Sequence, residues 1–464
     1  MLVVIPIEAK IRELLPKVFL AYQVLKKTNY DVLIGGQRFF SRQIRNYKNV
    51  VFFDKNTHFE RLDNLANTKK NEVCMLDEEG PVSILDESGI DSHYNKKLLN
   101  KIDKFFFWGK KDLKNLKYKL NKNKFVIAGH PKYDLLKNPY IKFFEKEIKI
   151  IKKKYKKFVF FPASFSPYNE NIIWEEKNKL KVTYPKKNQN FLNNKLNKII
   201  RYRKDSVKDY DKVRKVLYDF AVQNPNINII FRKHPRDDLL DIKKRFKNFP
   251  KNLILDHSFS ITPWVIACHI YMHSGCTSSL EAAVLRKKII TFIPHRNDEM
   301  CIFFKSFGEL QTTKQECLKK LNLLINQSEK KSNYKFISKN IDNFEKNKFF
   351  NDKFIKYLKK INLINSKIIF HKDVSDDITN FLYPFKNFFM KVMSYPKNIL
   401  LKTYMIKFLP EKHLVKKTDS EKKFKSLHLN ELNKILNSFK KVDNQKFLHK
   451  VNKISDNVFL IKKR

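Results

Sequence analysis

The chain has 464 residues, 42% of them hydrophobic, which excludes a disordered protein and favours two or three globular domains. Its 96 lysines and arginines exceed its 47 acidic residues and give a formal net charge of +49. This charge leaves two interpretations: a nucleic-acid or anionic-membrane partner, or a compositional bias that loads every solvated face with lysine. We favour the second, because the basic residues are spread along the chain.

Cysteine usage and the apolar runs bear on the compartment. The five cysteines lack CxxC spacing, which predicts a reducing compartment and no structural zinc. The first apolar run, residues 2–7, is short for a secretion signal and is followed by charged residues, so we interpret it as a β-strand. No uninterrupted apolar run approaches the roughly 20 residues that span a bilayer. A cytoplasmic protein is therefore expected.

Residues 1–145 alternate short apolar runs with helix-like patterns, which is typical of a Rossmann-like parallel sheet. The expected strands cover residues 2–7, 31–34, 50–53, 73–76, 105–108 and 125–128. A helix is expected after the first strand, with Pro16 at its start. Residues 8–13 are then expected to form a loop at a strand's carboxyl end, where sites often lie.

Two turns in this half carry residues suited to chemistry. Asp77, Glu78 and Glu79 follow the strand at 73–76, and a carboxylate there could deprotonate an acceptor hydroxyl. A solvated acidic turn is an equal alternative. The turn at 129–134 supplies His130 and Asp134, which either complete a cleft or act as caps.

A lysine-rich run, residues 142–157, separates this domain from a second Rossmann-like set at 155–330. Its expected strands cover residues 158–161, 227–231, 270–272 and 289–293. Residues 172–203 are polar and are expected to form an irregular surface insertion, whereas Thr262 and Pro263 are typical of a helix start.

The motif R-K-H-P, residues 232–235, directly follows the expected strand at 227–231. Cations and a histidine at a strand's carboxyl end form an anion clamp, in which His234 donates to phosphate or protonates a leaving group. The alternative is a solvated charge run, which is common in a lysine-rich chain.

The most specific motif is H-S-G-C-T-S-S-L-E-A, residues 273–282, between an expected strand and an expected helix. Gly275 permits a turn, and the free N–H groups of Thr277, Ser278 and Ser279 would bind an anion at the helix start. Ser278 and Glu281 also have the spacing of a capping box, and Glu281 could instead accept hydrogen bonds from ribose hydroxyls.

Residues 331–464 lack glycine and strand–helix alternation, and we expect a mainly helical, basic extension with weak order at its end. Residues 381–409 combine aromatic and aliphatic side chains with lysines. This pattern predicts either contact with an anionic membrane or helices that pack across the two domains.

Together, G-H-P-K-Y-D, R-K-H-P and S-G-C-T-S-S-L-E-A resemble the GT-B glycosyltransferase superfamily, in particular bacterial surface carbohydrate biosynthesis proteins. The last two motifs also resemble glycerophosphotransferases that use CDP-glycerol and nucleotide-sugar 2-epimerases. The resemblance covers about residues 1–330 and implies two Rossmann-like parallel-sheet domains facing a cleft. This chain departs from the pattern in lacking a glycine-rich loop near its start.

The resemblance implies a metal-independent glycosyltransferase with a CMP- or UDP-type sugar donor as co-substrate and no other cofactor. The acceptor would be a saccharide or lipid-linked saccharide of a surface polysaccharide or lipopolysaccharide, with peripheral contact to the inner membrane and no nucleic-acid partner. Glu8 joins the acidic turn as a candidate base. The implied donor ligands are Arg232, His234, Ser274, Gly275, Thr277, Ser278, Ser279 and Glu281. The rival functions are polyol-phosphate transfer, 2-epimerisation and nucleic-acid binding.

Overall fold

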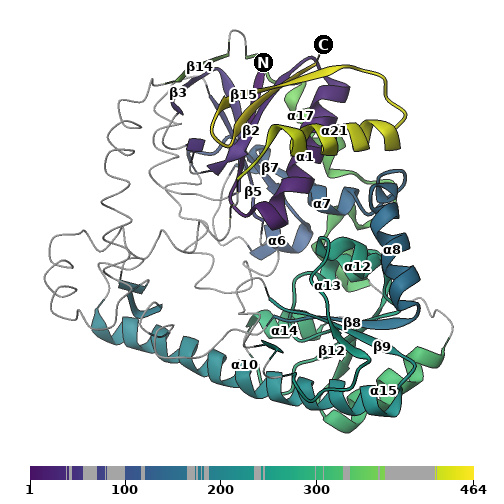
Figure 1. Cartoon of the computed structure of the whole chain (residues 1–464). Helices are drawn as coiled ribbons and strands as arrows, with labels where there is room; N and C mark the ends of the chain where they lie inside the picture. Colours follow the sequence, from purple (N-terminus) through teal and green to yellow (C-terminus); the bar gives the residue numbers. More distant parts are fainter. Residues whose placement is uncertain are drawn as a thin grey trace, which may run out of the picture.

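The computed structural model describes two α/β domains, which lie one above the other in Figure 1. The described residues are 1–37, 39–40, 44–55, 71–78, 80, 100–115, 121–164, 173, 176–178, 180–181, 188–234, 242–243, 246–297, 299–306, 308–327, 335–363, 366–370, 424 and 426–463.

The first domain is built on an eight-stranded sheet with the order β15-β16-β2-β1-β4-β5-β6-β7. Its parallel strands are β1 (Leu2–Ile7), β2 (Asp31–Gly36), β4 (Val50–Asp54), β5 (Glu72–Leu76), β6 (Lys104–Phe107) and β7 (Phe125–Ile127). These are the six strands expected from the sequence. They were visible because their continuous apolar runs are buried by layers on both faces of the sheet.

The helices of this half of the chain are α1 (Lys10–Lys27), α6 (Lys110–Asn115), α7 (Pro131–Asp134) and α8 (Glu145–Tyr155), with the short 3-10 helices η2 (Lys122–Lys124) and η3 (Tyr140–Phe144). The expected loop at residues 8–13 is wrong, because α1 begins at Lys10 and Pro16 lies inside it. The Glu13 carboxylate accepts the backbone N–H groups of Glu8 and Ala9. This internal cap lets the helix begin earlier than the proline suggested.

The second domain contains a six-stranded parallel sheet with the order β10-β9-β8-β11-β12-β13. The strands are β8 (Phe158–Pro162), β9 (Asn228–Arg232), β10 (Leu253–Leu255), β11 (Ile270–His273), β12 (Lys288–Phe292) and β13 (Glu309–Gln311). The helices are α10 (Gln189–Gln223), α12 (Ile261–Ala267), α13 (Ser279–Val284), α14 (Glu299–Lys305) and α15 (Lys314–Asn326).

Helix α10 corrects the expected irregular insertion. Residues 189–203 belong to this 35-residue helix, which runs along the bottom of Figure 1. Asn188 caps it by accepting the backbone N–H of Phe191. The segment is polar because much of this part of the helix is exposed, and not because it is irregular.

The predicted GT-B fold class, two Rossmann-like domains with parallel sheets, is confirmed by the strand order. In the first sheet β1 lies between β2 and β4, and in the second β8 lies between β9 and β11. The chain therefore reverses its direction of strand addition beside β1 and beside β8. In parallel α/β sheets, ligands bind beyond the carboxyl ends of the strands at such switch points.

The C-terminal segment returns to the first domain. It contains α16 (Lys335–Asn340), η4 (Asp342–Phe344), α17 (Phe350–Leu358) and α21 (Leu429–Val442), of which α17 and α21 pack against α1. Strand β14 (Lys367–Phe370) pairs with β3 (Ile44–Lys48), and β15 (His449–Ser455) and β16 (Val458–Lys463) form an antiparallel hairpin beside β2.

The extension, expected to be mainly helical, also contains the strands β14, β15 and β16. Strand β16 buries Val458, Phe459 and Ile461 against the domain, a long-range pairing that local patterns do not reveal. The amphipathic segment at 381–409 lies outside the described residues. Within the described part of the chain, no helix is long and apolar enough to cross a membrane.

Candidate functional site

A neutral histidine and a glycine shape the loop at the switch point of the second sheet. His273, fully buried at the end of β11, accepts the N–H of Gly275 at Nδ1 (3.2 Å). Its Nε2 therefore carries the proton and donates to the Thr291 hydroxyl (3.0 Å). Burial lowers the pKa of His273 to about 3. Gly275 has a φ of +86°, which side chains other than glycine rarely adopt.

A buried ion pair fixes the same loop from behind. The Arg296 guanidinium is 1% exposed and donates from Nε to the Asp209 carboxylate of α10 (2.7 Å). Its Nη2 donates to the carbonyl of Ser274 and to the Ser274 hydroxyl (2.8 Å), and Ser164 after β8 donates to the same carbonyl (2.7 Å). Ser274, expected to bind the donor, thus has its hydroxyl in the anchor of the loop.

The start of α13 differs from the expected capping box. The Ser278 side chain makes no cap hydrogen bond, because its hydroxyl contacts the Tyr271 hydroxyl (2.6 Å) and the Cys276 thiol (3.0 Å). Ser279 donates both its N–H (3.0 Å) and its hydroxyl (2.6 Å) to the Cys276 carbonyl, so its N–H is not free as expected. Thr277 is exposed.

Glu281 points away from its own helix cap. It accepts a hydrogen bond from the Thr262 hydroxyl (2.9 Å), and Thr262 lies inside α12 rather than at the expected helix start. Burial raises the pKa of Glu281, and the positive charge of Lys132 in the first domain partly offsets this rise. The carboxylate therefore faces the other domain.

The R-K-H-P motif lies at the end of β9. Arg232 donates to the carbonyls of Ser258 (3.0 Å) and Phe259 (2.8 Å), and so holds the loop that follows β10. His234 is half-buried, and its carbonyl accepts from Lys233 Nζ (3.3 Å). The rest of the motif, from residue 235, lies outside the described residues.

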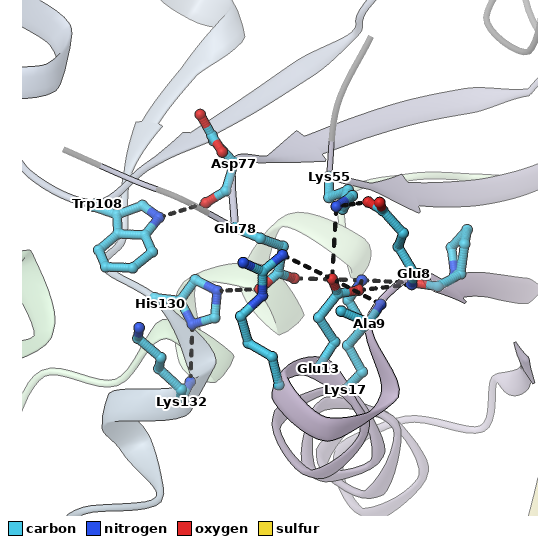
Figure 2. A network of polar contacts seen from close by, with 12 residues as sticks. Glu8, Ala9, Glu13, Lys17, Lys55, Asp77, Glu78, Trp108, His130 and Lys132 are labelled. Atoms are coloured by element: carbon cyan, nitrogen blue, oxygen red, sulfur yellow. Dashed lines mark hydrogen bonds and ion pairs between the residues drawn. The ribbon is translucent and has the colours of Figure 1, made fainter. Parts of the chain in front are cut away.

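The switch point of the first sheet carries a buried cluster of charges (Figure 2). Lys17 Nζ donates to the Pro6 carbonyl at the end of β1 (2.6 Å) and to Glu13 Oε2 (2.8 Å), and lies 3.4 Å from Glu78 Oε1. Burial raises the pKa of Glu13 in spite of the charge on Lys17. One ammonium group thus serves two carboxylates, one on α1 and one after β5.

Glu78 lies between Lys17 and His130 in Figure 2. His130 accepts the Lys132 N–H at Nδ1 (3.1 Å), so its Nε2 carries the proton and donates to Glu78 Oε2 (3.0 Å). Burial opposes ionisation of Glu78, but Lys17 and His130 outweigh it and hold this pKa well below its usual range. Burial also lowers the pKa of His130 to about 4. An ionised glutamate therefore faces a neutral histidine.

The other candidate bases occupy different surroundings. Glu8 is 28% exposed at its side chain and pairs with Lys55, which follows β4. Asp77 is buried, its carbonyl accepts from Trp108 Nε1 (2.7 Å), and its side chain points away from Glu78 and His130 in Figure 2. Glu79 lies outside the described residues.

Asp134 acts as a cap, one of its two expected roles. Its carboxylate accepts the backbone N–H groups of Phe350 (3.1 Å) and Asn351 (3.0 Å), the first residues of α17. It also accepts from the Asn343 amide (2.6 Å). The turn at 129–134 thus fastens the returning C-terminal segment to the first domain.

The two switch points face one another through Lys132. This half-buried lysine lies in α7, and its ammonium interacts electrostatically with Glu78 of its own domain and with Glu281 of the second. One hydrophobic cluster also contains residues of both domains, among them Phe106 and Trp264. The loops of both domains therefore meet at one place.

Several solved structures are similar to this chain in fold. The UDP-GlcNAc 2-epimerase of Methanocaldococcus jannaschii, solved with UDP-GlcNAc and UDP, is 14% identical over 77% of this chain and 99% of its own, with a TM-score of 0.47. The wall teichoic acid polymerase TagF is 9% identical over 78% and 88%, with a TM-score of 0.46. HepE of Anabaena, solved with UDP and glucose, is 10% identical over 78% and 99%, with a TM-score of 0.42.

No protein-family model and no curated protein matches the sequence. The fold class rests on the strand order of the two sheets.

Sequence reasoning missed the ionic residues that organise both switch points, namely Glu13, Lys17, Lys55, Lys132, Asp209 and Arg296. A signal existed for some of them. Glu13 and Lys17 are four residues apart and flank the apolar positions of α1, and Asp209 precedes the apolar face of α10 at the same spacing. A charged residue in register with an apolar helix face marks a buried ion pair. Arg296 has no such signal, because it lies in a loop.

Proposed function

We propose that this protein is a GT-B-type glycosyltransferase that binds a CMP- or UDP-type sugar donor at residues 273–281 and an acceptor at the first switch point. The observation that carries the proposal is the approach of Lys132 in the first domain to Glu281 in the second. It brings the carboxyl ends of both sheets together, where a ligand held by one domain can react with a ligand held by the other.

The second-domain loop is suited to a nucleotide. The Gly275 turn and the exposed Thr277 offer backbone and hydroxyl groups to a phosphate, and the Glu281 carboxylate can accept hydrogen bonds from ribose hydroxyls. Arg232 and the neutral His273 would act indirectly, by positioning the loops that hold the donor.

The first-domain site is suited to an acceptor hydroxyl. We favour Glu8 as the base, because its side chain is 28% exposed whereas Asp77 and Glu78 are buried, and Glu79 stays a candidate. Glu78, held ionised by Lys17 and His130, would orient the acceptor as a hydrogen-bond acceptor. Replacing Glu8 by Gln should lower kcat by about 10²–10⁴-fold with an unchanged Kd for the donor.

The test of the donor site is titration of the full chain with CMP, CDP and UDP, followed by assays with the corresponding activated sugars and saccharide acceptors. Glu281→Gln should weaken nucleotide binding, and Glu309→Gln, an exposed glutamate in the same domain, should not. Failure of all three nucleotides to bind would overturn the proposal. Mass-neutral conversion of a nucleotide sugar would indicate an epimerase, and transfer from CDP-glycerol a polyol-phosphate transferase.

Nucleic-acid binding predicts a different result. Affinity for DNA or RNA would fall steeply with salt and would survive Glu281→Gln. A lipid-linked acceptor at the cytoplasmic face of the inner membrane also belongs to our proposal, on the strength of the sequence pattern at 381–409. Co-sedimentation of the full chain with anionic vesicles tests it, and equal soluble fractions with and without vesicles would count against it.

A further inference from the structure

Lys132 is oriented by its surroundings before any ligand is considered. Its ammonium lies 4.8 Å from the centre of the Trp108 ring and 4.9 Å from that of Tyr133, and both rings are buried. Its backbone N–H donates to His130 Nδ1 (3.1 Å). The aromatic faces attract the cation and fix the direction of its side chain toward the second domain.

This ammonium has no oxygen acceptor in the described part of the chain. Its two nearest carboxylates are engaged elsewhere: Glu78 by Lys17 and His130, and Glu281 by Thr262. Lys17, by contrast, has both a carbonyl and a carboxylate within 2.8 Å. An ammonium carries three N–H donors, and those of the half-buried Lys132 are left for water or for a ligand. Consistently, burial lowers the pKa of Lys132 despite the two glutamates.

The position of Lys132 indicates which anion is missing. The electrostatic partner of its ammonium in the second domain, Glu281, lies in the first turn of α13, directly after Thr277 and Ser278. An anion bound by this loop would therefore lie within reach of a cation from the opposite domain. Phosphate oxygens suit a lysine, which binds them as a compact point charge.

We propose that Lys132 binds a phosphate oxygen of the nucleotide donor and is the first domain's contribution to the donor site. This inference rests on the proposed function, and it assigns to Lys132 a role in binding the nucleotide's phosphate rather than its base or ribose. The phosphate would be held between the two domains, so that donor binding fastens them together.

The experiment compares nucleotides with nucleosides on the full chain. Lys132→Met keeps an apolar stem over Trp108 and Tyr133 but removes the charge. It should weaken binding of CDP or UDP about 10–100-fold and leave cytidine or uridine unchanged, as expected for the loss of a hydrogen bond to a charged group. Lys132→Arg should retain most of the affinity. The matched control is Lys149→Met, an exposed lysine on α8 that should have no effect.

Tryptophan emission supplies a readout independent of activity. Nucleotide binding should change the emission of Trp108, because the ammonium over its ring engages the phosphate, and the change should disappear in Lys132→Met and in Trp108→Phe. If the nucleotide binds but Lys132→Met leaves its Kd unchanged, or weakens nucleosides equally, the inference is overturned. If Lys132→Met does not fold, Lys132→Gln is judged by the same two criteria. Failure of the unmodified chain to bind any nucleotide would instead overturn the proposed function.

Discussion

The two switch points solve the same topological problem with different chemistry. The first is organised by buried full charges, with Lys17 between Glu13 and Glu78. The second presents neutral groups, the glycine turn, hydroxyls and a histidine with a pKa of about 3, while its ion pair, Arg296 with Asp209, lies behind the loop. In the neutral loop the exposed Thr277 is suited to an incoming anion, whereas the charged cluster of the first switch point is suited to hold a carboxylate for a hydroxyl.

The largest effect is expected from removing the shared cation of the first switch point. Lys17→Met leaves Glu13 and Glu78 buried without their ammonium and should lower the free energy of unfolding by about 3–5 kcal/mol. Both carboxylate pKa values should rise, so the folded variant gains protons and the loss should shrink from pH 8 to pH 5. Urea unfolding at both pH values checks this, with Lys149→Met as control; a loss independent of pH would contradict the shared role.

The next effect concerns His273 in the second loop and the way it makes stability depend on pH. The folded pKa of His273, about 3, lies below the unfolded value of 6.5, so the unfolded chain binds the proton first. Its contribution to stability is complete above pH 6.5 and should be lost by about 1.4 kcal/mol per pH unit as the pH falls toward 3.

The difference between the unmodified chain and His273→Gln isolates this term. His130, with a pKa of about 4, acts in the same direction in both proteins, and Asp134, with a pKa raised by burial to about 6, acts in the opposite direction in both. Chemical denaturation between pH 7 and pH 5 should therefore show a shallower pH dependence for His273→Gln. Parallel curves would mean that His273 is not held neutral.

A smaller effect tests the start of α13. Ser278→Ala should lower the free energy of unfolding by about 1 kcal/mol, because loss of the Ser278 hydroxyl removes the buried partner of the Tyr271 hydroxyl. The losses caused by Ser278→Ala and Tyr271→Phe should not add up in the double variant, because the two hydroxyls share one hydrogen bond. If Ser278 instead capped α13, the two losses would be additive. Thr313→Ala, which removes an observed capping box on α15, provides the reference for a true cap.

The smallest effect on stability is expected at Glu281. Because Glu281 does not cap its helix and a glutamine oxygen can still accept from Thr262, Glu281→Gln should change the free energy of unfolding less than Ser278→Ala does, while it weakens nucleotide binding. Thermal unfolding and nucleotide titration of the same preparation check both parts. A loss near that of Thr313→Ala would restore the capping box as the correct interpretation.

The sequence predicted the parts of the molecule whose signal is local. Ten strands were found because each is a short apolar run next to turn residues, and both switch-point loops were located by following those strands to their ends. The short strands β10 and β13, the pair β3 and β14, and the hairpin β15–β16 were missed, and β16 finds its partner β2 only from far away in the chain.

The candidate site was predicted in place but not in detail. The spacing of Ser278 and Glu281 offered a capping box as one of two interpretations, but both side chains have partners elsewhere, at Tyr271 and Thr262. Lys132 was indistinguishable from the many other lysines of a chain with a net charge of +49, and Lys17 was marked only by its spacing from Glu13. The packing of α1 and α7 separates these two cations from fully solvated ones.

Because of the β15–β16 hairpin, the first domain can complete its sheet only at the end of translation. Strand β2 emerges early from the ribosome, but its outer edge pairs with β16, which is made only after the second domain has been translated. Until then the edge presents unpaired backbone groups, a template for association with other chains. The domain that is made first is thus finished last, and a chain interrupted anywhere before β16 would leave the outer edge of β2 without its partner.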